Sequence, residues 1–159
     1  PAFIGKSLTG LYFPKNIPIN LKKLTQNILS QIGEIVILKS EKQLDSITAI
    51  SGSGPAYFYK FIEILENSAL KIGLSKKNSK EIIIQTITGS LSLLTSTNLS
   101  AKQLRKNVSS KGGTTEAAIK TLDDNLLDQI FLRAIVSAKN RSNELAKELN
   151  IQIKQHTNK

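Results

Sequence analysis

The sequence predicts a mainly α-helical protein in which a short strand–helix–strand segment precedes a series of helices. Two observations lead to this fold class. Apolar residues in positions 1–40 alternate between strand-like and helix-like spacing, and after Ser40 they recur only at helical spacing. In addition, no glycine or proline interrupts the chain from Thr114 to its end, so a long terminal helix is expected.

The front of the chain carries the pattern of an α/β sheet. Residues 5–13 mix small, polar and aromatic side chains and predict a strand weakly, whereas residues 20–32 space their apolar side chains as a helix does. Gly33 is expected to end that helix, and the β-branched run at residues 34–38 is typical of a buried strand in a parallel sheet. Because two strands alone do not make a stable sheet, we expect further strands upstream, in a longer protein.

Capping sequences mark the starts of the expected helices. Ser40 and Gln43 form one predicted capping box, Ser100 and Gln103 form a second, and Ser75 is a further candidate cap. These signals and the apolar spacing predict helices over residues 40–50, 56–72 with Pro55 in the first turn, 75–94, 100–108, 114–122 and 126–149. The isoleucine-rich third helix is expected to be heavily buried, and the last helix is expected to turn its apolar side chains inward.

The composition excludes several kinds of active site. The chain contains no cysteine, which rules out disulfides, thiolate catalysis and cysteine metal sites, and which fits a reducing compartment such as the cytoplasm. The one histidine, His156, lies in the polar tail, so no metal site and no serine–histidine–aspartate triad is predicted. No apolar run approaches the roughly 20 residues of a membrane-spanning helix, and no signal sequence is recognised.

The net charge of +10 has two interpretations. A strongly basic chain is typical of proteins that bind nucleic acid. Lysine, isoleucine, asparagine and serine are all used heavily here, however, as happens when codon usage is AT-rich, and the lysines are scattered without interleaved aromatic residues. We therefore favour a lysine-rich proteome over a nucleic-acid partner.

The glycine-containing loop before the expected helix at residues 114–122 is the strongest candidate for a binding site. It consists of Ser109-Ser110-Lys111-Gly112-Gly113-Thr114-Thr115. Glycines let the backbone curl so that successive N–H groups point to one side, and the helix start adds a partial positive charge. The hydroxyl groups of Ser110, Thr114 and Thr115 can donate or accept hydrogen bonds. This combination suits a small carboxylate; the alternative is a purely structural helix cap with a glycine turn.

Other candidate sites are weaker. Gly52-Ser53-Gly54 superficially resembles a dinucleotide fingerprint, but Tyr57 occupies the place of the third glycine and no convincing strand precedes it, so a tight joint between helices is favoured. The adjacent Asp123 and Asp124 would diverge on a helix, and Glu63 and Glu66 are expected on a solvated face. No acid–base pair is predicted.

Two long motifs resemble those of a known family. In order and spacing they are similar to signatures of the pyrroline-5-carboxylate reductases, and they read Ile47-Thr48-Ala49-Ile50-Ser51-Gly52-Ser53-Gly54-Pro55-Ala56-Tyr57 and Val108-Ser109-Ser110-Lys111-Gly112-Gly113-Thr114-Thr115. The opening Pro1-Ala2 and the later Arg141-Ser142-Asn143-Glu144-Leu145 also resemble segments of this family. The similarity extends from Pro1 to about Leu149.

The resemblance implies a fold and an activity. Residues 1–40 would be the last part of a Rossmann domain that binds NADPH or NADH, and residues 41–159 would be an all-helical dimerisation domain of the 6-phosphogluconate dehydrogenase C-terminal type. Members form interlocked dimers that can assemble further into decamers. They reduce 1-pyrroline-5-carboxylate to L-proline in the last step of proline biosynthesis, and the cofactor supplies the hydride. The main cofactor-binding residues are expected outside this chain.

The same resemblance assigns roles to the glycine loop. Thr115 is similar to the threonine whose hydroxyl group meets the ring nitrogen of the substrate. Ser110 resembles the residue that holds the substrate carboxylate, together with backbone N–H groups around Gly113 and Thr114. Gly112 belongs to the same predicted binding loop. One further residue, Val108, is similar to a residue of the pocket wall.

Two departures from the family pattern carry expectations of their own. Lys111 stands where the family usually has proline, so we expect a more mobile loop that still binds substrate. The glycine-rich nucleotide-binding turn is missing, so this chain by itself is not expected to catalyse. A catalytically inactive, truncated helical association module is therefore the alternative function. A basic helical nucleic-acid binder would require lysines gathered on one face.

Overall fold

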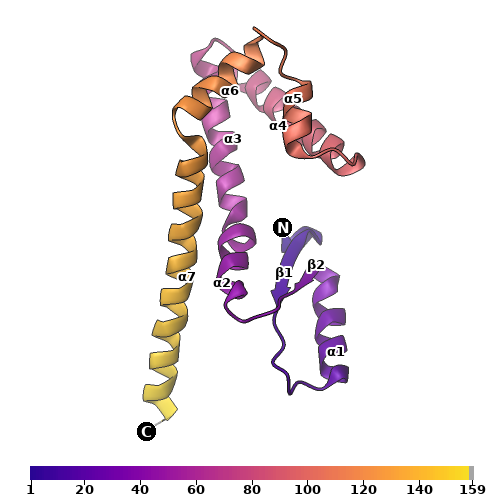
Figure 1. Ribbon diagram of the computed structural model, residues 1–159, viewed down its shortest axis with the longest axis vertical. Helices are drawn as coiled ribbons and strands as arrows, with labels where there is room; N and C mark the ends of the chain where they lie inside the picture. The colour runs from indigo at the N-terminus through magenta and orange to yellow at the C-terminus, as the bar shows by residue number, and fades with distance from the viewer. Residues whose placement is uncertain (158–159) are drawn as a thin grey trace. The chain divides into compact units, whose positions relative to one another are not determined.

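The computed structural model describes residues 1–157, with side chains through Ile153, and it is mainly helical as predicted (Figure 1). Its elements are η1 (Ala2–Ile4), β1 (Ser7–Leu11), α1 (Ile19–Leu29), η2 (Ser30–Ile32), β2 (Gly33–Ile37), α2 (Gln43–Ile47), η3 (Thr48–Gly52), α3 (Gly54–Lys71), α4 (Lys76–Ser96), α5 (Ala101–Asn107), α6 (Thr114–Asp124) and α7 (Leu127–Thr157). The chain divides into two units, the first made of Pro1–Pro55 with Leu132–Lys159 and the second of Ala56–Phe131.

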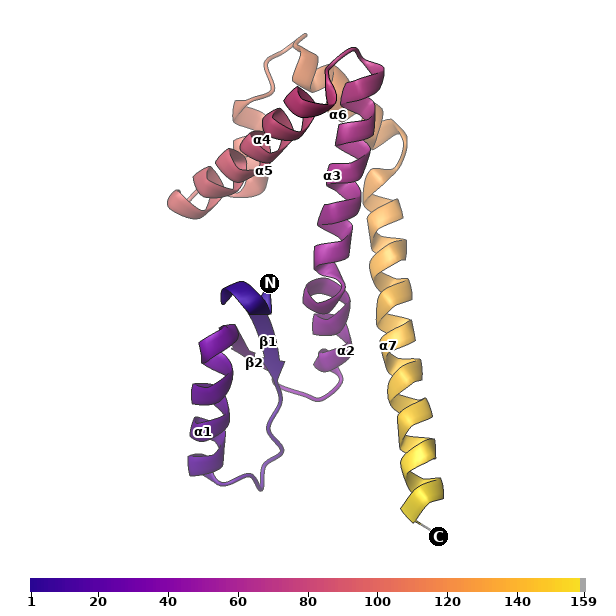
Figure 2. The ribbon, with the colours of Figure 1, turned by 180° about the vertical axis from the view of Figure 1, so that it is seen from behind.

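The two strands of the first unit pair in parallel, which confirms the predicted strand–helix–strand pattern. The register runs from Ser7 opposite Gly33 to Leu11 opposite Ile37, and α1 lies beside the pair as its crossover helix (Figure 2). A Cβ atom at Gly33 would overlap the backbone of Ser7, and the Ser7 hydroxyl donates to the Ile32 carbonyl at 2.6 Å. Glycine is therefore required here, because β1 and β2 approach too closely at this point for any side chain.

A short helix and a π-helical turn carry the chain from the sheet toward α3. The turn spans Thr48–Gly52, where the Ser53 N–H donates to the Thr48 carbonyl at 2.8 Å, and its Ala49 is almost fully buried. This confirms the predicted joint between helices around Gly52-Ser53-Gly54. A further link within the first unit comes from Asp45, whose carboxylate accepts hydrogen bonds from the Ser142 hydroxyl at 2.8 Å and the Asn143 amide at 3.2 Å on α7.

Side-chain caps begin two helices of the second unit. The Ser75 hydroxyl accepts from the Asn78 N–H at the start of α4, and Ser100 and Gln103 form a complete capping box at the start of α5. Both caps were predicted. The Ser40 capping box was only half correct, because α2 begins at Gln43. The Gln43 side chain still reaches back to accept from the Ser40 N–H at 3.2 Å.

Large apolar surfaces of the single chain remain exposed. On α4, Ile83 is 8% exposed, but its neighbours Ile82 and Ile84 are 49% and 45% exposed, so the predicted burial of the isoleucine run is wrong for one chain alone. On α7, Leu132 is 62% exposed instead of facing inward. These faces have the character of surfaces that another polypeptide covers.

None of the helices in the described part of the chain carries an apolar stretch long enough to cross a membrane.

Candidate functional site

The candidate site is the connection between α5 and α6 in the second unit. The capping box at Ser100 fixes the start of α5, and the helix ends where the Val108 N–H donates to the Leu104 carbonyl at 3.3 Å. The Ser109 hydroxyl then donates to the Arg105 carbonyl at 2.7 Å and satisfies one of the last free acceptors of the helix. Hydrogen bonds to side chains therefore stabilise both ends of the short helix α5, and they fix the direction in which the loop leaves it.

The two glycines of the loop meet different requirements. Gly112 adopts a φ of +73°, which side-chain-bearing residues rarely adopt, although a Cβ atom there would meet nothing within 4 Å. Gly113 has an ordinary backbone conformation, but a Cβ atom on it would overlap the Ser110 hydroxyl oxygen and lie 3.0 Å from the Ser110 carbonyl oxygen. The Gly113 N–H donates to that carbonyl at 3.0 Å and closes a tight turn.

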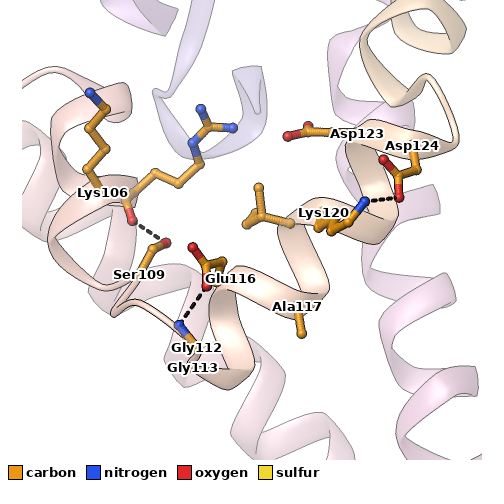
Figure 3. Close-up of a pocket in the computed structure, with 11 residues that line it drawn as sticks. Lys106, Ser109, Gly112, Gly113, Glu116, Ala117, Lys120, Asp123 and Asp124 are labelled. Carbon is orange, nitrogen blue, oxygen red and sulfur yellow. Dashed lines mark hydrogen bonds and ion pairs between the residues drawn. The ribbon is translucent and has the colours of Figure 1, made fainter.

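A carboxylate from the first turn of α6 also holds this loop. The Glu116 side chain accepts a hydrogen bond from the Gly112 N–H at 2.6 Å (Figure 3). The residue before the helix, Gly113, has no side chain that could cap α6, and Glu116 instead ties the first turn of the helix back to the loop. Sequence reasoning missed Glu116 as a site residue. The available signal was an acidic residue at the third helical position behind a cap lacking a side chain.

The contacts within the loop determine which N–H groups stay open to a ligand. The N–H groups of Gly112 and Gly113 are both engaged, by Glu116 and by Ser110. Within the described residues, no acceptor meets the N–H groups of Thr114, Thr115 and Glu116, which begin α6. All three lie at the positive end of the helix dipole, where a carboxylate is stabilised.

A cavity of about 690 Å³ lies between α5 and α6 (Figure 3). Its walls come from both helices and from the loop, and they comprise Arg105, Lys106, Ser109, Gly112, Gly113, Glu116, Ala117, Ile119, Lys120, Asp123 and Asp124. Lys120 turns to Asp124 in an ion pair of 2.7 Å, whereas Asp123 points toward the cavity. The charged side chains of both signs around the cavity favour a small polar ligand over an apolar one.

The structure brings the predicted site residues together on one loop, though not all on one surface. Gly112 and Gly113 line the cavity. Ser110, Thr114 and Thr115 belong to the same turn but do not line it, and Val108 is 66% exposed at the end of α5. In the described part of the chain, no three acidic or histidine side chains gather as a metal site would require.

A family model for pyrroline-5-carboxylate reductase dimerisation matches residues 41–145 of this chain. The chain belongs to the pyrroline-5-carboxylate reductase family. Both predicted motifs lie inside the matched region, and the boundary at residue 41 coincides with the predicted start of the helical part. A dimerisation domain accounts for the exposed apolar faces, since its role is to associate with another chain.

Relatives and solved structures agree with this family. The chain is 34% identical over 146 residues to pyrroline-5-carboxylate reductase of Haemophilus influenzae, with 91% of this chain and 54% of the relative covered. It is 36% identical over 147 residues to pyrroline-5-carboxylate reductase 2 of Bacillus subtilis, with 92% and 52% covered. The crystal structure of Plasmodium falciparum pyrroline carboxylate reductase with NADP bound superposes with a TM-score of 0.83 at 34% identity, with 89% and 57% covered.

The matches cover most of this chain but only part of each pyrroline-5-carboxylate reductase. The chain spans about half the length of the curated relatives that it matches, although nearly all of the chain is matched. The fold and the family assignment therefore concern this part of a reductase, namely the helical part with a parallel strand pair in front.

Proposed function

We propose that this chain supplies the substrate half-site and the dimer interface of a cytoplasmic enzyme that reduces 1-pyrroline-5-carboxylate to L-proline. The observation that supports this most directly is the start of α6, where the described residues offer no acceptor to the N–H groups of Thr114 and Thr115, next to a closed glycine turn. A site of this kind holds one carboxylate in a fixed orientation, which is what a small cyclic amino-acid substrate offers.

The residue roles that we propose combine this placement with the family resemblance. The substrate carboxylate would accept from the N–H groups of Thr114 and Thr115 and from the Ser110 hydroxyl. The Thr115 side chain would meet the ring nitrogen, and the exposed Val108 would pack against the ring carbons. Gly112 and Gly113 would contribute by the shape of the turn, because their own N–H groups are engaged.

The hydride of such a reduction comes from NADPH or NADH. The described residues do not form a nucleotide cradle: two prolines, Pro14 and Pro18, lie between β1 and α1, and the Gly52-Ser53-Gly54 segment forms a helical joint. We therefore assign no cofactor contact to this chain. The parallel pair of β1 and β2 is consistent with residues 1–40 being the last part of a nucleotide-binding domain, with residues 41–159 forming the helical domain.

The partner that fits the exposed faces best is a second copy of the same protein. The exposed apolar residues of α4 and α7, such as Ile82 and Leu132, have the character of an obligate homodimer interface. Dimers of this kind could assemble further into decamers, as the family resemblance suggests.

The test of this function is a reductase assay on the full-length protein with 1-pyrroline-5-carboxylate and NADPH or NADH. Thr115→Val removes the hydroxyl group at constant shape and is expected to lower kcat/KM by about 10- to 100-fold, whereas Thr115→Ser should retain most of it. Thr121→Val is the matched control on the same helix, because the Thr121 hydroxyl only donates to the Ala117 carbonyl.

Two results would contradict the proposal. An unmodified full-length protein that folds but forms no proline would favour the inactive association module. Equal activity of Thr115→Val and Thr121→Val would show that the Thr115 hydroxyl does not meet the substrate.

A further inference from the structure

We propose that Glu116 is a positioning residue of the substrate site, which holds the glycine turn in its binding conformation and restricts the site to a single carboxylate. This inference rests on the proposed function of the loop. It concerns a residue that lies outside the predicted anion-binding set and whose carboxylate carries the same charge as the substrate group bound beside it.

The turn needs an external support because its own sequence is flexible. Residues 108–113 contain two consecutive glycines and no proline, and Lys111 stands where a proline ring would have fixed φ. The turn depends on the left-handed conformation of Gly112, which an unsupported glycine leaves readily. A contact to the Gly112 N–H is therefore placed where it restrains the loop most.

Glu116 is suited to give this support. Its carboxylate lies in the first turn of α6, where the helix dipole stabilises a negative charge, and it reaches back four residues to the Gly112 N–H at 2.6 Å. Hydrogen bonds to ionised acceptors are short and strong. The Gly113 N–H is already held by the Ser110 carbonyl, so the two contacts together fix both glycines.

The same contact limits what the site can bind. A glycine loop before a helix is a general phosphate-binding arrangement when all of its N–H groups are open. Here the Gly112 N–H is engaged by a carboxylate, and the charge of Glu116 lies beside the open N–H groups at the start of α6. That charge repels a phosphate dianion more strongly than it repels a single carboxylate.

Three variants at Glu116, one control variant and one variant at Lys111, all in the full-length protein, test this role. Glu116→Ala removes charge and acceptor, Glu116→Gln keeps the acceptor without the charge, and Glu116→Asp keeps the charge but is one methylene too short. Glu63→Ala is the control, because Glu63 lies on α3 of the same unit and pairs only with Lys60. The measurements are amide hydrogen exchange at Gly112, kcat and KM for 1-pyrroline-5-carboxylate, and competitive inhibition by inorganic phosphate.

The expected results separate positioning from general stability. Glu116→Ala should speed exchange at Gly112 and raise KM about fivefold with little change in kcat, and Glu116→Asp should resemble it. Glu116→Gln should keep KM near the unmodified value while phosphate inhibition strengthens roughly threefold. Lys111→Pro should tighten substrate binding or leave it unchanged, and should reduce the effect of Glu116→Ala, because the ring then restrains the same turn.

Several results would overturn the proposal. They are unchanged Gly112 exchange in Glu116→Ala, equal effects in Glu63→Ala, or a lower KM in Glu116→Ala, which would make Glu116 a competitor of the substrate. If the unmodified protein showed no reductase activity, the proposed function would fail separately, and Gly112 exchange would still decide whether Glu116 holds the turn. If Glu116→Ala did not fold, the Glu116→Gln and Glu116→Asp pair would decide.

Discussion

At the scale of single residues, the loop before α6 shows how two neighbouring glycines can be indispensable for unrelated reasons. At Gly112 there is free space but an unfavourable backbone conformation, and at Gly113 there is an ordinary conformation but no space. Neither reason can be read from the sequence, in which the two residues are equivalent. The structure therefore predicts that the two positions tolerate different replacements: residues that adopt a positive φ at Gly112, and no residue with a Cβ atom at Gly113.

Substitutions at Gly112 should rank by their tolerance of positive φ. We expect Gly112→Ala to lower the free energy of unfolding by about 1–2 kcal/mol and Gly112→Asn to lower it by less, because asparagine enters the left-handed region more readily. Urea unfolding of the full-length protein measures both. Equal losses for alanine and asparagine would mean that the cost comes from contacts and not from the backbone.

Gly113 should not be rescued by asparagine. A Cβ atom of any residue would overlap the Ser110 hydroxyl oxygen, so both Gly113→Ala and Gly113→Asn should displace Ser110 and raise KM for the substrate. Removing the obstructing hydroxyl group by combining Gly113→Ala with Ser110→Ala should recover part of the folding stability. If the double variant were no more stable than Gly113→Ala, the clash would not be the cause.

At the scale of elements, local signals in the sequence identify helix starts well when a side chain makes the cap. Ser75 and Ser100 were found in this way, and the Ser100 box includes the reciprocal contact from Gln103. Ser40 does not cap α2, because it lies three residues before the first helical residue, Gln43. The Gln43 side chain still accepts from the Ser40 N–H. The cap at Gly113 has no side chain, and the remaining local signal there was the acidic Glu116 in the first turn of α6, which sequence reasoning missed.

The Ser100 cap should contribute measurably to stability. Ser100→Ala is expected to cost about 1 kcal/mol of unfolding free energy, because the Gln103 N–H loses its acceptor. Ser92→Ala in the interior of α4 is the matched control and should be neutral or slightly stabilising, since alanine favours helices. Thermal or urea unfolding of the three proteins makes the comparison, and a Ser92→Ala loss equal to that of Ser100→Ala would argue against the cap.

Apolar periodicity predicted the helices but not what covers them. The run of Ile82, Ile83 and Ile84 predicted a heavily buried helix, yet of these three residues Ile83 alone is buried by its own chain. A hydrophobic pattern records that a face leaves water and does not record whether the covering surface belongs to the same molecule. The candidate loop was found because its chemistry is local, whereas burial was misjudged because it depends on which surface covers the face.

At the scale of the whole molecule, the exposed apolar faces tie folding to association. A dimerisation domain whose faces stay open in one chain has little folded stability as a monomer, so its unfolding should depend on protein concentration. Raising the concentration of the full-length protein should raise the midpoint of thermal unfolding. A midpoint that does not move over a wide range of concentrations would contradict this.

Charged substitutions on the same faces should separate the subunits. Leu132→Asp on α7 and Ile82→Asp on α4 are each expected to weaken association by about 2 kcal/mol or more, roughly 30-fold in Kd, because a buried charge would lack a partner. Lys147→Gln on α7 is the control and should leave the mass in solution unchanged. Sedimentation or light scattering measures the outcome, and an unaltered dimer in both aspartate variants would place the interface elsewhere.

The hydrogen bonds from Ser142 and Asn143 to Asp45 have a consequence for the order in which the protein is made. Asp45 and Ser142 are 97 residues apart in the chain, and the first unit uses segments from both sides of the second. At ordinary synthesis rates Asp45 leaves the ribosome about 5–20 s before its partners exist. The first unit must therefore wait for α7, while the second unit, which is continuous in sequence, can form during translation.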